Sequence, residues 1–185
     1  MTQTLNQPSS KLLTFDDYRN YQSNDDTLYE LFRGQLIPMP NPTDLHNRIC
    51  EYIVYQLKHY FTRNNINLIT STTTGVRTEI NSSRIPDIVV AHREIWQIMS
   101  NRKGAAIFDF GDVPRLVIEV TSQNWRDDYI RKRSEYALID IPEYWIIDPQ
   151  QEVVLVCSNP QNKYGYDTQE FTLGQNFSSF QFPNL

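Results

Sequence analysis

A six-residue run, Leu-Val-Ile-Glu-Val-Thr from Leu116 to Thr121, constrains the fold of this chain more than any other segment. β-branched residues at this density predict a strand in the core. The run also contains one carboxylate, Glu119, and a buried carboxylate without a partner is costly. Alternation along a strand puts Val117, Glu119 and Thr121 on one face. The fold must therefore supply a partner for Glu119 on that face.

Helical and strand-like segments alternate on both sides of this run. Apolar residues recur every four positions from Leu45 to Phe61, which predicts a long amphipathic helix over residues 43–63. A capping-box spacing from Thr14 to Asp17 predicts a short helix that ends near Tyr21. Two further helices are predicted over residues 94–100 and 126–139. Strands are predicted at residues 29–37 (two strands around a turn at Gly34), 66–71, 75–80, 88–91, 116–121, 144–147 and 153–157, with a turn at 81–83 and an edge hairpin at 164–173.

These elements predict a single α/β domain over residues 11–185, in which helices flank a central mixed β-sheet. Residues 1–10 are polar and are expected to form a flexible tail. The composition, 39% hydrophobic and 21% charged, is that of an ordinary globular protein. No run is long enough to cross a bilayer and none is typical of a signal peptide, so a cytoplasmic location is expected. Cys50 and Cys157 are too few for a disulfide framework and are predicted to be core residues.

The net charge of −5 gives the chain no overall basic field that would attract nucleic acid. Any phosphate contact must therefore come from a local basic patch. Candidate basic side chains gather on two predicted helices: Lys58, His59 and Arg63 on one, and Arg126, Arg131, Lys132 and Arg133 on the other.

A second carboxylate, Asp87, follows Pro86 at the start of the β-branched strand at residues 88–91. Two acids on neighbouring strands form a hard-oxygen site suited to Mg²⁺, for which Mn²⁺ is expected to substitute. Such an ion generates hydroxide and neutralises charge on a phosphate. The alternative is that Glu119 faces water and that Asp87 caps a turn.

The helix after Glu119 carries Asp128, Lys132 and Tyr136 at a spacing of four residues, which places them along one face. A short loop between strand and helix would point this polar stripe back toward Glu119. Lys132 would then contact a phosphate or the attacking water as a compact positive charge. The alternative is an ordinary solvated Asp–Lys pair.

Pro86-Asp87 and Glu119-Val120-Thr121 resemble the PD-(D/E)XK signature of the restriction-endonuclease superfamily. A wider pattern resembles a widespread bacterial endonuclease family in that superfamily, once known only as a domain of unknown function. The resemblance extends over about residues 28–156. Its motifs are Tyr29-Glu30-Leu31 with Gly34, His46, Pro86-Asp87, Glu119-Val120 with Ser122, Lys132, Tyr136, Pro142-Glu143-Tyr144-Trp145 and Asp148-Pro149.

The resemblance implies a restriction-endonuclease-like fold, with the helix at 43–63 on one side of the sheet and the helix at 126–139 on the other. It implies that Asp87 and Glu119 are metal ligands. The superfamily lysine normally lies two residues after the acid, where this chain has Thr121, so the resemblance assigns that role to Lys132. The chain also has Asp140 where the family usually has glycine.

Three other residues are candidates for a catalytic role. Glu30 could supply a third carboxylate near the end of the sheet. His46, in the first turn of the long helix, could orient a water or a phosphate, or could serve only as a structural hydrogen-bonding residue. Tyr136 could brace the lysine or be half-buried packing.

These observations lead to the hypothesis that the chain hydrolyses DNA phosphodiester bonds with a Mg²⁺-activated water. A homodimer would suit cleavage of both strands. The first rival is an inert nucleic-acid-binding module, which Thr121 and the acidic net charge favour. The second is a protein-interaction domain anchored by exposed Trp96 and Trp125. No sequence specificity is readable.

Overall fold

The computed structural model describes residues 12–24, 27–122, 125–161, 165–183 and 185. The tail expected at residues 1–10 lies outside this part of the chain. Among the helices in these ranges, none has the length and apolar character needed to cross a membrane.

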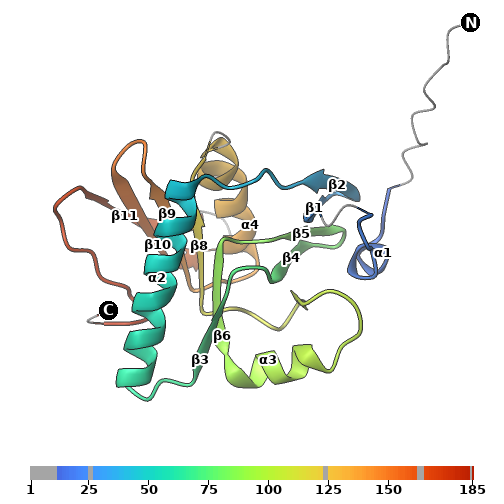
Figure 1. Cartoon of the computed structure of the whole chain (residues 1–185), viewed down its shortest axis with the longest axis horizontal. Coiled ribbons are helices and arrows are strands. Elements are labelled where there is room, and N and C mark those ends of the chain that lie inside the picture. Colours follow the sequence, from blue (N-terminus) through green and yellow to red (C-terminus); the bar gives the residue numbers. More distant parts are fainter. Residues whose placement is uncertain (1–11, 25–26, 123–124, 162–164, 184) are drawn as a thin grey trace, which may run out of the picture.

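A six-stranded mixed sheet forms the larger layer of the molecule (Figure 1). Its two central strands, β8 and β9, run parallel, and the other neighbouring strands pair antiparallel. In spatial order the strands are β11 (Gly165–Thr172), β10 (Val153–Gln161), β9 (Glu143–Asp148), β8 (Leu116–Val120), β6 (Ile88–His92) and β3 (Leu68–Ser71).

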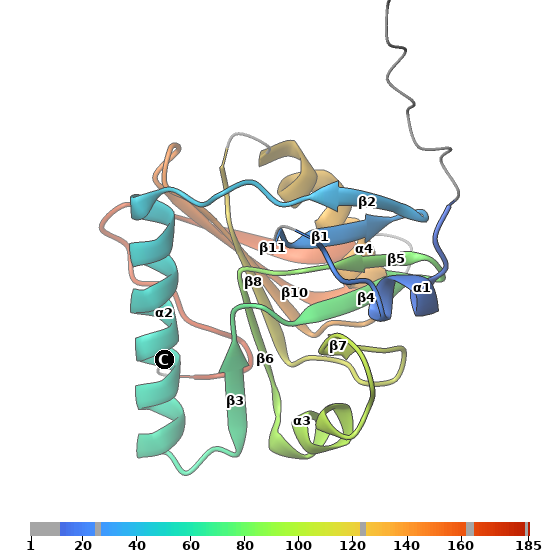
Figure 2. The same cartoon turned by 45° about the vertical axis from the view of Figure 1, so that its right-hand side comes forward.

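Helices cover both faces of this sheet, as predicted. Helix α2 (Asp44–Arg63) lies along one face, where Leu57 and Phe61 pack with Ile118 of β8. Figure 2 shows this helix at the left side of the molecule, with the strands of the sheet to its right. The opposite face is covered by α3 (Arg93–Ser100) and by α4 (Arg133–Leu138), which packs against Val117. Alternation along β8 thus separates two apolar cores, and Glu119 shares the α4 side with Val117.

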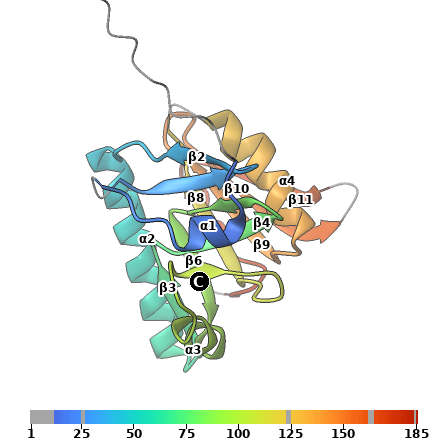
Figure 3. The same cartoon turned by 90° about the vertical axis from the view of Figure 1, so that its right-hand side faces the viewer.

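A smaller five-stranded sheet packs beside the first, so the prediction of one central sheet was incomplete. Figure 3 shows its strands behind α1 (Phe15–Arg19). Phe15 and Tyr18 of this helix pack against Leu31 and Ile107 of the sheet. Its spatial order is β2 (Gln35–Pro38), β1 (Tyr29–Phe32), β5 (Ser82–Arg84), β4 (Gly75–Glu79) and β7 (Ile107–Phe108).

The turn predicted at residues 81–83 lies at residues 80–81 instead, because Ser82 and Ser83 belong to strand β5 and are fully buried. Their hydroxyls find local acceptors: Ser82 donates to Glu79 and Ser83 donates to the carbonyl of Val76. Serine residues favour the prediction of a turn because their hydroxyls often hydrogen-bond to nearby backbone groups. Here the same capacity satisfies a buried strand instead.

The helix predicted at residues 126–139 begins as a π-helix, η1 (Asp127–Lys132), before it continues as α4. Such wide turns are rare and are frequently found at functional sites. Cys50 and Cys157 are buried free thiols, which confirms their prediction as core residues. Trp96, expected to be exposed, is instead partly buried and packs edge-on against Phe108 with ring centroids 5.0 Å apart.

Candidate active site

The two acids predicted to hold a metal lie on neighbouring strands. In the antiparallel pair of β6 and β8, Ile88 lies opposite Ile118, and continuing this register by one residue places Asp87 opposite Glu119. The Asp87 carboxylate accepts a hydrogen bond from the backbone N–H of Val120, with an N–Oδ2 distance of 2.7 Å. Asp87 is therefore fixed against the strand that carries Glu119.

Glu119 is almost completely buried, with 3% of its surface exposed. Each of its carboxylate oxygens has its own partner. The hydroxyl of Tyr136 donates to Oε1 at 2.9 Å, and the ammonium Nζ of Lys132 lies 3.0 Å from Oε2. The core thus supplies the compensation that a carboxylate in this strand requires.

Lys132 reaches inward to the acids instead of pointing to solvent. Besides its contact with Glu119, its Nζ lies 3.0 Å from Oδ1 of Asp128 and 3.9 Å from Oε1 of Glu30. Asp128, Lys132 and Tyr136 therefore lie on the face of the helix that points toward Glu119, as their spacing predicted. The interpretation of this stripe as a solvated surface pair was wrong, because all three side chains are buried or nearly so.

His46 contacts Asp87 from the first turn of α2. This turn begins at Thr43, whose hydroxyl accepts the backbone N–H of His46. Imidazole Nε2 lies 3.1 Å from Oδ2 of Asp87, and Nδ1 lies 3.8 Å from the sulfur of Cys50. The hydrogen bond to Asp87 is the main cause that raises the pKa of His46 to about 10. At neutral pH His46 is therefore a cation that holds Asp87 in place.

One donor atom each from His46, Cys50 and Asp87 lies within 4.8 Å of the others, close enough to ligate one ion. Glu119 is not part of this group, because its carboxylate turns toward Lys132 and Tyr136. Asp87 lies between the two arrangements. It can share an ion with Glu119 only if the Lys132 ammonium moves aside.

Glu30 lies beside the site, but both of its carboxylate oxygens are engaged. Oε2 lies 2.9 Å from Nη1 of Arg84, and Oε1 accepts the backbone N–H of Ile85 at 3.1 Å. The expected third carboxylate thus serves first to bind Arg84. Its 3.9 Å separation from Lys132 adds to the negative field around that ammonium.

Arg84, whose guanidinium belongs to a residue that is only 3% exposed, was not among the residues predicted for the site. It makes a bidentate contact to Glu135 at 2.7 and 2.8 Å, and it also contacts Glu30 and Asp127. Burial alone would lower the pKa of Arg84, but the bond to Glu135 and the surrounding acids raise it above its ordinary value. Its position three residues before Asp87 could have indicated a role at the site. However, Ser82 and Ser83 of the same strand were predicted to form a turn.

Carboxylates outnumber cations in this cluster. Burial, together with the charges of Asp87, Asp128 and Glu30, raises the pKa of Glu119 well above its usual value, and Lys132 only partly opposes this. Burial likewise raises the pKa of Asp128. The acids are Glu30, Asp87, Glu119, Asp127, Asp128 and Glu135, and the cationic groups are His46, Arg84, Arg131 and Lys132.

This surplus of negative charge matches the needs of a divalent cation. Burial is the main cause of the raised pKa of Glu119, and repulsion from neighbouring carboxylates adds to it; this repulsion is relieved when a cation of charge two binds between them. Carboxylate oxygens are the donors that Mg²⁺ and Mn²⁺ prefer. The residues present therefore fit a divalent cation at Asp87 and Glu119.

Comparison with known proteins identifies the class to which this fold and site belong. Residues 15–184 match the model of the Uma2 family, described as "Putative restriction endonuclease". The chain belongs to this family, which confirms the resemblance noted in its sequence.

Among solved structures, the fold is similar to that of "a putative nuclease belonging to DUF820 from Anabaena variabilis". The TM-score is 0.65 with 22% sequence identity, over 86% of this chain and 84% of the other. At this identity the likeness concerns the fold. A search among curated proteins gave no match.

Proposed function

We propose that this chain is a Mg²⁺-dependent endonuclease with a restriction-endonuclease-like fold, which hydrolyses DNA phosphodiester bonds and accepts Mn²⁺ in place of Mg²⁺. The observation that carries the proposal is the convergence of distant residues on one point. The ammonium of Lys132 lies 3.0 Å from the buried carboxylate of Glu119, on the strand to which Asp87 is hydrogen-bonded.

Asp87 and Glu119 are the residues that would hold the ion. A bound Mg²⁺ supplies a Lewis acid for the phosphate and lowers the pKa of a coordinated water. The surrounding residues orient these acids: Val120 N–H and His46 fix Asp87, and the Tyr136 hydroxyl fixes Oε1 of Glu119. Oriented donors of this kind lose little freedom when the ion binds.

Lys132 would stabilise the negative charge that develops on the phosphate in the transition state. A positive charge held in a water-poor site is worth more than the same charge in water. Thr121, at the usual lysine position, is buried, and its backbone N–H donates to Ile147. We assign the lysine's role to Lys132, and its contact with Glu119 supports an active site over the inert module that Thr121 favours.

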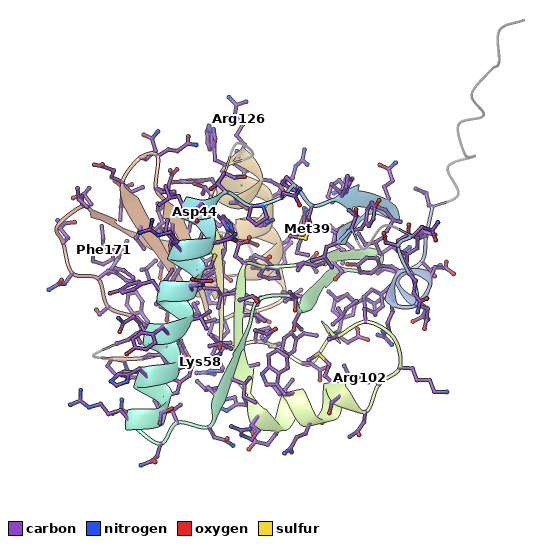
Figure 4. The ribbon with its side chains drawn as sticks, viewed as in Figure 1. Met39, Asp44, Lys58, Arg102, Arg126 and Phe171 are labelled. Atoms are coloured by element: carbon purple, nitrogen blue, oxygen red, sulfur yellow. The ribbon has the colours of Figure 1, made fainter. Side chains whose placement is uncertain are left out.

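An arginine-rich surface beside the site supports DNA as the substrate despite the acidic net charge. Arg33 and Arg131 are 72% and 64% exposed at the side chain, and both guanidinium groups lie over the ring of Phe32. Arg126 lies over the ring of Trp125 and extends away from the molecule in Figure 4. Arginine paired with aromatic rings suits phosphates and bases together.

The test is an incubation of the protein with supercoiled plasmid in Mg²⁺, in Mn²⁺ and in chelator. We expect metal-dependent nicking that falls by at least about 100-fold in Asp87→Asn, Glu119→Gln and Lys132→Met. Lys103→Met, which changes an exposed lysine outside the site, is the matched control for Lys132→Met. Circular dichroism of each variant checks that the fold persists.

Other outcomes would favour the rival functions. DNA binding without nicking would favour an inert nuclease-fold module, and the absence of both would favour a protein-interaction domain. Sedimentation of the free and DNA-bound protein tests the homodimer that cleavage of both strands would use.

A further inference from the structure

The Lys132 ammonium lies equally close to two carboxylates from different elements. Its Nζ lies 3.0 Å from Glu119 on β8 and 3.0 Å from Asp128 in its own helix. Both acids are buried. The proposed mechanism uses Glu119 and Lys132 but gives no role to Asp128.

A metal ion at Glu119 competes directly with Lys132. Oε1 of Glu119 accepts the Tyr136 hydroxyl, so Oε2 is the oxygen on which the ion and the ammonium would meet. Two cations on one oxygen repel each other, and the ammonium must therefore move away when the ion binds. If Glu119 were the sole partner of Lys132, metal binding would leave a buried ammonium unpaired, and the cost of that unpaired charge would oppose metal binding.

We propose that Asp128 is a positioning residue that retains the Lys132 ammonium when the metal takes Glu119. This inference rests on the proposed nuclease function. Because Asp128 already lies at ion-pair distance and closer than Glu30, Lys132 gives up only one of its three carboxylate partners and stays beside the metal. Asp128 thereby favours loading of the ion and keeps the lysine within reach of the phosphate.

The local backbone holds Asp128 in this position. Its carbonyl accepts a hydrogen bond from the hydroxyl of Tyr144, a fully buried residue of β9, at 3.0 Å. The preceding acid, Asp127, points elsewhere and contacts Arg84 and Arg131. The wide turn of η1 thus presents two successive acids to two different sets of cations.

The experiment measures Mn²⁺ binding by calorimetry on the full chain without DNA, and separately kcat and KM for nicking. Asp128→Asn should weaken Mn²⁺ binding and lower kcat by about 10-fold each, the scale typical of groups that orient metal-site residues, with KM little changed. Asp128→Glu keeps the carboxylate and should recover part of both losses. Asp127→Asn, which removes an acid from the same turn, is the matched control and should weaken Mn²⁺ binding less.

A double-variant cycle separates positioning from a merely structural role. In the Lys132→Met background there is no ammonium to retain, so adding Asp128→Asn should cause no further loss of Mn²⁺ affinity or kcat. Equal losses with and without the lysine, or unchanged Mn²⁺ binding in Asp128→Asn, would overturn the inference. If the wild-type chain neither binds Mn²⁺ nor nicks DNA, the proposed function fails first.

Discussion

Replacing Arg84 by methionine tests whether the buried charge cluster supports the fold. Arg84 contacts Glu135, Glu30 and Asp127 at 2.7–3.2 Å, and methionine keeps the apolar stem while removing every one of these contacts. The three carboxylates are left without their shared cation in a region nearly closed to water. Removing one partner from a buried ion pair costs about 3–5 kcal/mol.

We therefore expect Arg84→Met to lower the free energy of unfolding by about 3–5 kcal/mol. For a chain of this size that corresponds to a fall in Tm of roughly 10 °C. Urea titration followed by circular dichroism measures the free energy, and a thermal scan gives Tm. The matched control is Arg33→Met: its pair with Glu79 spans 3.7 Å at the surface and should contribute less than about 1 kcal/mol.

A second variant identifies the cause of the loss. Adding Glu135→Gln to Arg84→Met removes one of the carboxylate charges left unpaired and should restore on the order of 1 kcal/mol of unfolding free energy. A loss in Arg84→Met no larger than in Arg33→Met would refute the reasoning. A double variant less stable than Arg84→Met alone would also refute it, because the unpaired carboxylate of Glu135 would then not be the source of the instability.

Three further predictions concern stability and DNA binding. The pKa of Asp109 is lowered because hydrogen bonds from Arg77 and Arg19 outweigh the opposing effect of burial. Its contribution is therefore present at neutral pH and is lost as the pH falls through its folded pKa, which lies below the ordinary value. Asp109→Asn should cost about 1–2 kcal/mol at pH 7, and this cost should shrink as the pH is lowered into that range, as measured by urea unfolding. Asp140 has a φ of +59° just after α4, so Asp140→Gly should raise stability by up to about 1 kcal/mol in thermal unfolding, and a loss would contradict this. Arg131→Ala should reduce the slope of log Kd for DNA against log salt concentration by about 1, whereas an unchanged slope would remove Arg131 from the proposed DNA surface.

Local periodicity was the part of the fold that the sequence could predict. The four-residue repeat from Leu45 to Phe61 corresponds to α2, and the β-branched run at Leu116 corresponds to β8. The contact between Lys132 and Glu119 was also foreseen, because strand alternation and helical spacing are both short-range rules. Neither rule says how separate strands pair, and the second sheet was therefore missed.

The charge cluster could not be predicted for the same reason. Arg84 meets Glu30 and Glu135 across more than fifty positions of the chain in each case, and these contacts follow from pairing of β1 with β5 and packing of α4. The two polar serines at the start of β5 favoured the prediction of a turn, so the strand that carries Arg84 was not predicted. Asp140, in contrast, could be recognised from sequence as a residue at a glycine position, and its positive φ supplies the physical reason.

Strands β8 and β9 run parallel, so the chain must cross from one end of the sheet to the other between them, and η1 with α4 makes that crossing. The segment that delivers the Lys132 amine to Glu119 is thus the same segment that allows the two central strands to lie side by side. Local unfolding of this crossing would move Lys132 away from Glu119 and would at the same time loosen the pairing of β9 with β8. A molecule in which this crossing has unfolded should accordingly lose the contact between Lys132 and Glu119 together with the pairing of β8 with β9.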